Sequence, residues 1–170
     1  MPRIHVCPLS RLEETARRTG ARTLVTLINA GTSVPRPTGI APERHLHVAM
    51  SDIVEALDGH ILPHDDHIGE LLRFVGGWDR REPLLIHCWA GVSRSTAAAF
   101  VTACALNPAR AELDLARALR EASPTATPNA RLVELADRRL GRGGRMVAAV
   151  RGIGRGADCF EGTPFALDLA

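Results

Sequence analysis

Several common residue types are missing from this chain of 170 residues. The sequence contains no lysine, no glutamine and no tyrosine, and aromatic residues make up only 4% of it. All 21 basic residues are therefore arginines, so every fixed positive charge is a planar guanidinium that can donate two parallel hydrogen bonds. The formal net charge is only +2, which predicts no overall electrostatic attraction to nucleic acid or to a membrane.

Long apolar runs are also absent. None approaches the ~20 residues needed to cross a bilayer, and the start of the chain leads into a strand-like run and does not resemble a secretory signal. The four cysteines form no Cys-x-x-Cys pair, which favours free thiols over a disulfide framework. We therefore expect a cytoplasmic protein without membrane insertion, and the sequence leaves its oligomeric state open.

Arginines are concentrated near the end of the chain. Residues 131–155 hold seven of them against Glu134 and Asp137, a local excess of +5. Such a run could dock anionic lipid, a phosphoprotein or RNA. Because no aromatic residue interleaves with these arginines, we predict a solvated helical face and no nucleic-acid partner.

The length predicts a single domain over residues 1–170, with 141–170 a helical and extended C-terminal segment. Apolar and β-branched runs predict strands at 4–7, 23–28, 44–50 and 83–87. Helical patterns cover 10–19, 67–78, 95–106, 107–122, 130–140 and 145–153. This order predicts an α/β fold with a central, mostly parallel sheet of four to five strands flanked by helices.

Capping patterns set the expected helix starts. Ser10 with Glu13 has the form of a capping box, and Asp65 or Asp66 can cap the helix at 67–78. Asn107 followed by proline predicts the start of the helix at 107–122.

The segment 86–95, Ile-His-Cys-Trp-Ala-Gly-Val-Ser-Arg-Ser, concentrates the reactive groups of the chain. A buried strand ends at His87, a helix begins at Ser95, and five residues separate Cys88 from Arg94. A loop of this length can turn its backbone N–H groups inward at a helix N-terminus, which favours bound anions and a cysteine thiolate. Arg94 can hold two phosphoryl oxygens at once.

This segment resembles the active-site loop of the protein tyrosine phosphatase superfamily, and its second half is most similar to the dual-specificity branch. Tyrosine-specific members rely on a recognition tyrosine and a water-positioning glutamine, and this chain contains neither. The resemblance implies that Cys88 is the nucleophile, that Ser95 assists departure of the thiolate and that His87 supports the loop. It also implies that the phosphate is held by the loop, namely Trp89, Ala90, Gly91, Val92, Ser93 and Arg94.

The same resemblance implies an aspartate as general acid, on a loop after a strand. Asp52 fits best, since it follows the predicted strand and lies 36 residues before Cys88 (88 − 52); Asp58 is the alternative. Asn129 resembles the turn residue that packs behind the catalytic loop, although a helix N-cap explains it equally well.

A metal site is a weaker hypothesis. His60, His64 and His67 are possible ligands, but Pro63 disfavours the helix that would align them. The cysteine mechanism needs no cofactor and no metal.

The sequence therefore predicts a protein phosphatase that hydrolyses phosphotyrosine in phosphoprotein substrates through a cysteinyl-phosphate intermediate. Phosphoserine and phosphothreonine are further candidate substrates. Two alternatives stay open. The same chemistry could act on a phosphoinositide, phosphatidylglycerophosphate or nucleotide, or the chain could be a catalytically silent phosphate-binding module.

Overall fold

A five-stranded sheet forms the centre of the computed structural model, which describes residues 1–170. The strand order is β3-β2-β4-β1-β5. The four parallel strands are β1 (Arg3–Pro8), β2 (Thr23–Ile28), β3 (His45–Ala49) and β4 (Leu84–Cys88), whereas β5 (Phe165–Asp168) runs antiparallel to β1 at one edge. This confirms the predicted fold class.

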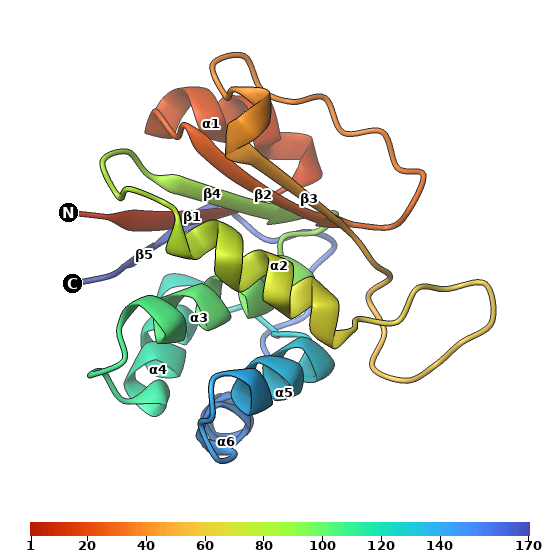
Figure 1. Cartoon of the computed structure of the whole chain (residues 1–170), viewed down its shortest axis with the longest axis vertical. Helices are drawn as coiled ribbons and strands as arrows, with labels where there is room; N and C mark the ends of the chain where they lie inside the picture. The colour runs from red at the N-terminus through yellow and green to blue at the C-terminus, as the bar shows by residue number, and fades with distance from the viewer.

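Helices cover both faces of this sheet unequally (Figure 1). One face carries α1 (Leu12–Thr19), next to the short 3₁₀ helices Leu9–Arg11 and Pro42–Arg44. The other carries α2 (Asp65–Gly76), α3 (Arg94–Leu106), α4 (Glu112–Ala122), α5 (Ala130–Arg139) and α6 (Arg145–Ile153). None of these helices combines the length and apolar character that crossing a membrane requires.

The core is divided by the sheet. A cluster of 31 buried residues fills the space between the sheet and helices α2 to α6, and a cluster of seven lies under α1. Helix α3 is buried along almost its whole length, because its small alanines let it approach the sheet and the surrounding helices closely. This central helix begins directly after β4 and fixes the loop between them.

Three predicted helix starts are wrong. Helix α1 begins after Arg11 without a side-chain cap, because the Ser10 hydroxyl donates to the distant Glu161 carboxylate at 2.8 Å. His64, not Asp65 or Asp66, caps α2, and its ring accepts from the Asp66 N–H.

The third error concerns Asn107. Its backbone N–H bonds to Ala103, so it ends α3, and α4 begins only at Glu112. The other helix boundaries agree closely with those predicted from the sequence. Asn129 is the N-cap of α5.

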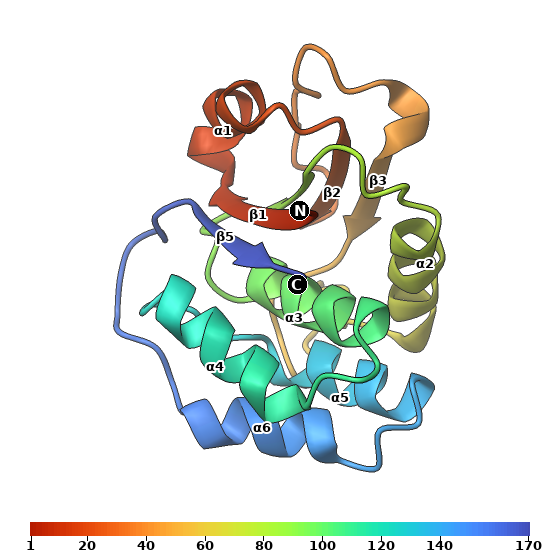
Figure 2. The ribbon, with the colours of Figure 1, turned by 90° about the vertical axis from the view of Figure 1, so that its left-hand side faces the viewer.

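The C-terminal segment returns across the molecule after α6 (Figure 2). We call residues 154–164 the C-terminal strap. Its Ala157 N–H bonds to Pro124 O at 2.9 Å and its Gly162 N–H to Ala90 O at 2.7 Å. The strap then leads into β5, which the sequence had indicated only as an extended tail.

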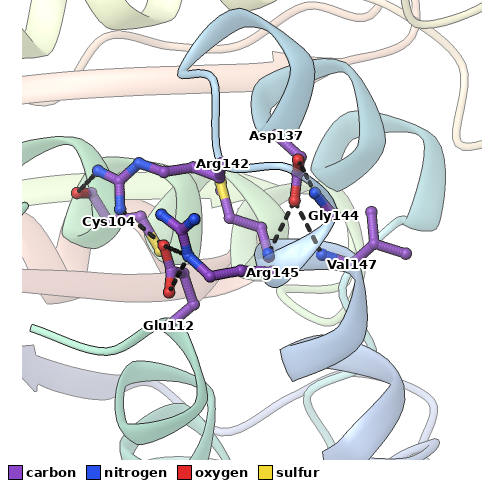
Figure 3. Close-up of polar contacts among 8 residues, drawn as sticks. Cys104, Glu112, Asp137, Arg142, Gly144, Arg145 and Val147 are labelled. Carbon is purple, nitrogen blue, oxygen red and sulfur yellow. Dashed lines mark hydrogen bonds and ion pairs between the residues drawn. The ribbon is translucent and has the colours of Figure 1, made fainter.

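A buried charged cluster ties α6 to the helices beneath it (Figure 3). Glu112, 6% exposed, accepts from Arg142 Nη1 at 2.8 Å and from Arg145 Nε at 3.2 Å. Arg142 Nη2 also donates to Cys104 O at 2.8 Å, and Asp137 accepts from the Gly144 N–H at 2.7 Å.

Burial alone would raise the pKa of Glu112, but the hydrogen bonds from Arg142 and Arg145 outweigh it and lower that pKa to about 2. Other arginines of this region, Arg138, Arg139 and Arg155, pair with Glu134, Asp65 and Asp158. Most arginines of this region are exposed, in agreement with the predicted solvated face, and only Arg142 is buried. The pairs of Arg139, Arg142 and Arg145 reach carboxylates on other helices.

Candidate active site

The segment singled out in the sequence lies at the carboxyl end of the sheet, in its centre. Cys88 is the last residue of β4, between β1 and β2, and Arg94 is the first residue of α3. We call residues 88–94 the cysteine loop. The position of β4 and the first turn of α3 therefore fix both ends of this loop.

The backbone of the cysteine loop turns its carbonyl groups outward. The carbonyls of Trp89 and Ala90 accept from the N–H groups of Leu9 and Gly162, and those of Val92 and Ser93 accept from Thr127 and Asn129. None of the N–H groups of residues 89–93 donates to a main-chain carbonyl. Unbonded N–H groups at a helix N-terminus form a nest suited to an anion.

Gly91 makes this turn possible. Its φ is +69°, and a Cβ atom there would lie 2.8 Å from Pro8 N and 2.9 Å from Cys7 C. Both are backbone atoms of β1, so a side chain has no space.

Arg94 presents one edge of its guanidinium group to the cleft. Its Nη1 donates to Asn29 Oδ1 and to Met50 O, both at 2.8 Å. The buried Nε has no hydrogen-bond partner, and a buried donor without a partner costs free energy. The edge that carries Nε and Nη2 is therefore available to two oxygens of a bound oxyanion.

The thiol of Cys88 is buried at the base of the loop. Its Sγ lies 3.1 Å from Ser95 Oγ, a distance suited to a hydrogen bond to sulfur. Behind it, His87 Nδ1 lies 3.1 Å from Cys88 O and must donate, because a carbonyl oxygen only accepts.

His87 belongs to a hydrogen-bonded chain inside the sheet. Its Nε2 lies 2.7 Å from the Thr26 hydroxyl, which lies 2.8 Å from His45 Nε2. Burial lowers the pKa of His87 to about 4, so the ring is neutral at pH 7 and Nε2 accepts from Thr26. This chain fixes the tautomer of His87 and the orientation of the Cys88 carbonyl.

Asp52 follows β3 and faces the same region. Its Oδ1 accepts from Ser93 Oγ at 2.7 Å and from Asn129 Nδ2 at 2.9 Å. The Oδ1 of Asn129 caps α5 by accepting from the Leu132 N–H at 3.0 Å, and its backbone N–H donates to Ser93 O of the cysteine loop at 3.2 Å.

A cleft of about 400 Å³ brings these groups together. Seven of its nine lining residues were singled out in the sequence, namely Asp52, Cys88, Trp89, Ala90, Val92, Ser93 and Arg94. The other two, Asn29 and Cys159, were not. Trp89 is 58% exposed and lines this cleft. Asp58 does not line this cleft.

Three residues near the site were missed by the sequence analysis. Asn29 directly follows the predicted strand at 23–28 and was given no role, yet it orients Arg94. Thr26 lies in a run of apolar and β-branched residues, which indicates only a buried strand. Cys159 lies on the C-terminal strap, and no local sequence pattern indicates the path of that segment. The end of β2 beside β4 could have suggested Asn29, because adjacent parallel strands end at the same edge.

The possible metal ligands and the other two buried cysteines lie outside this arrangement. His64 and His67 form the N-terminal cap of α2, and no group of three or more His, Cys, Asp or Glu residues could hold a metal ion. Cys7 pairs in register with His87, and burial raises its thiol pKa to about 12. Cys104 is buried in α3, where burial likewise raises its pKa to about 12.

Comparison with known proteins gives a result only at the level of structure. No family model and no curated protein matches the sequence. Among solved structures, Cydia pomonella PTP-2 phosphatase has a TM-score of 0.62 at 20% identity, covering 79% of this chain and 84% of that one. Human DUSP28 has a TM-score of 0.62 at 17% identity, with coverages of 89% and 95%.

The fold is that of a dual-specificity phosphatase. A third match in this fold is the human tyrosine phosphatase-like serine/threonine/tyrosine-interacting protein, with a TM-score of 0.64 at 16% identity and coverages of 82% and 91%. In the dual-specificity phosphatase fold of the present chain, the cysteine loop occupies the turn between the central strand and the buried helix. These structural matches support the resemblance in fold only. The chemistry has to be argued from the residues of the cleft.

Proposed function

We propose that the protein is a metal-independent phosphatase that hydrolyses phosphomonoesters through a cysteinyl-phosphate intermediate. The observation that carries this proposal is the free edge of the buried Arg94 guanidinium in the same cleft as Cys88. Together with the unbonded N–H groups of the loop, it forms a site for a tetrahedral dianion directly next to a nucleophile.

We assign each step to a residue of this cleft or its base. Cys88 Sγ, as thiolate, attacks phosphorus while the bond from phosphorus to the leaving oxygen breaks, and Asp52 gives its proton to that oxygen. Water then attacks the phosphocysteine, Asp52 takes a proton from it, and the sulfur leaves as thiolate. The Ser95 hydroxyl, 3.1 Å from the sulfur, stabilises the departing thiolate.

The mouth of the cleft favours a phosphoprotein, with phosphotyrosine as the main substrate, over a polyanionic lipid or a nucleotide. Trp89 supplies an exposed aromatic wall for a phenyl ring. The adjoining cleft contains one cation, Arg155, which is already paired with Asp158 at 2.7 Å. A polyanionic substrate would meet few free positive charges here.

The alternative of a phosphate-binding module without turnover is less well supported. One protein of this fold is named tyrosine phosphatase-like, so the fold alone does not establish catalysis. In the present chain Cys88, Arg94 and an aspartate share one cleft, and these are the groups that turnover requires.

Turnover of an aryl phosphate in excess chelator tests the proposal. We expect the wild-type protein to hydrolyse 4-nitrophenyl phosphate with EDTA present, and rapid acid quenching to trap a phosphate adduct on the Cys88 peptide by mass spectrometry. A folded protein that binds tungstate but gives neither product nor adduct would instead be a binding module.

Asp52 and Asp58 can be separated by a matched pair of substitutions. Asp52→Asn should lower kcat/KM on phenyl phosphate by about 10²- to 10⁴-fold and flatten the basic limb of its pH–rate profile. Asp58→Asn makes the same charge change in the same loop, outside the cleft, and should retain near wild-type activity. The opposite pattern would make Asp58 the acid.

A further inference from the structure

Only one of the two carboxylate oxygens of Asp52 is hydrogen-bonded to the protein. Its Oδ1 accepts both hydrogen bonds, from Ser93 Oγ at 2.7 Å and from Asn129 Nδ2 at 2.9 Å. Its Oδ2 makes no hydrogen bond with another protein group, and the residue lines the same cleft as Cys88. The two oxygens of this carboxylate are therefore not equivalent.

The segment that carries Asp52 has few other contacts with the body of the protein. We call residues 51–63 the acid loop. It closes on itself through Ser51, whose N–H donates to Ile61 O at 2.9 Å and whose hydroxyl accepts from the Ile61 N–H at 3.2 Å. Most of its side chains are exposed, so apolar packing contributes little to its position.

The start of α5 holds both ends of the acid loop. Asn129 Nδ2 donates to Ile53 O at 3.2 Å, in addition to Asp52, and Arg131 Nε donates to Pro63 O at 2.6 Å. A few hydrogen bonds from one helix turn thus set the position of the loop.

The same turn also binds the cysteine loop. The N–H groups of Thr127 and Asn129 donate to Val92 O at 2.9 Å and to Ser93 O at 3.2 Å. Asn129 therefore contacts the loop that carries the nucleophile through its backbone and the loop that carries the acid through its side chain. It sets the distance between them.

We propose that Ser93 and Asn129 are positioning residues that hold Asp52 with its transferable proton on Oδ2. This inference rests on the proposed function of Asp52 as general acid. A proton on Oδ1 would compete with the two donors already there, whereas Oδ2 is free to carry it. After the proton has passed to the leaving oxygen, the same donors hold the carboxylate while Oδ2 takes a proton from water.

Two substrates that differ in leaving group test this role. Phenyl phosphate has a poor leaving group and depends on protonation, whereas 4-nitrophenyl phosphate has a good one and depends on it much less. Asn129→Ser is the informative variant, because serine caps helices as well as asparagine does but cannot reach Asp52 with an amide. Ser93→Ala removes the other donor, and Ser93→Thr retains a hydroxyl.

We expect Asn129→Ser and Ser93→Ala each to lower kcat/KM on phenyl phosphate by about 10- to 100-fold, with a much smaller loss on 4-nitrophenyl phosphate. The basic limb of the pH–rate profile on phenyl phosphate should weaken, the melting temperature should stay near that of the wild type, and Ser93→Thr should restore most of the rate. Equal losses on both esters, or no loss on either, would overturn the inference.

Asp52→Asn in the same series separates this inference from the function on which it rests. If Asp52→Asn loses activity equally on both esters, the acid assignment is wrong and the positioning role falls with it. If Asp52→Asn loses far more activity on phenyl phosphate than on 4-nitrophenyl phosphate and Asn129→Ser does not, the acid assignment stands and only the positioning role is wrong.

Discussion

Replacement of Cys88 by serine should abolish phosphatase turnover while phosphate binding is retained. Loss of a covalent nucleophile costs on the order of 10⁴-fold or more in kcat, and a serine hydroxyl is a far weaker nucleophile than a thiolate. The unbonded N–H groups of the loop and the free edge of Arg94 are unchanged by this substitution. Tungstate or inorganic phosphate should therefore still bind, as measured by calorimetry.

Cys159→Ser is the matched control for this prediction. It makes the same exchange of sulfur for oxygen on another wall of the same cleft, and its activity on 4-nitrophenyl phosphate should remain close to that of the wild type. Turnover by Cys88→Ser above about 1% of wild type would contradict a cysteinyl-phosphate mechanism.

Replacement of Glu112 by glutamine should lower the free energy of unfolding by about 3 to 5 kcal/mol, because it leaves a buried arginine without its counter-charge. The side chain of Arg142 is only 10% exposed, and Glu112 is its carboxylate partner at 2.8 Å. Urea unfolding at pH 7 measures the effect. Glu134→Gln breaks the exposed pair with Arg138 on α5 and should cost less than about 1 kcal/mol.

The same substitution should change the acid stability of the protein. The pKa of Glu112 is lowered in the folded state to about 2, so its contribution is complete above the unfolded pKa and is lost as the pH falls from about 4.5 towards 2. The difference corresponds to about 3 kcal/mol. Glu112→Gln should lose less stability than the wild type over this pH range, and identical acid unfolding curves would contradict the assignment.

Local patterns predicted the parts of the site that are local in sequence. The cysteine loop lies within ten residues, and its flanking strand and helix have clear apolar patterns, so position 88 at the end of β4 and position 94 at the start of α3 follow from the sequence. The strands at 23–28 and 84–88 and the helix at 145–153 were predicted closely for the same reason.

Contacts between distant segments could not be predicted in this way. Asn29 and Arg94 are 65 residues apart, and Asn129 and Asp52 are 77 residues apart. Helix caps failed where tertiary partners competed for the capping side chain, as Glu161 does for Ser10. A capping pattern describes what a residue can do locally, whereas the folded chain offers it other partners.

The two ends of the chain lie beside each other (Figure 2), near the amino ends of the parallel strands and therefore remote from the cleft. Arg3 pairs with Asp168 at 2.6 Å, and the Leu169 N–H bonds to Pro2 O at 3.3 Å. Parallel strands place their amino ends there, while Cys88 lies at the carboxyl end of β4. An affinity tag or a surface tether attached at either end would therefore leave the mouth of the cleft open, and a short peptide could join the ends into a circular chain.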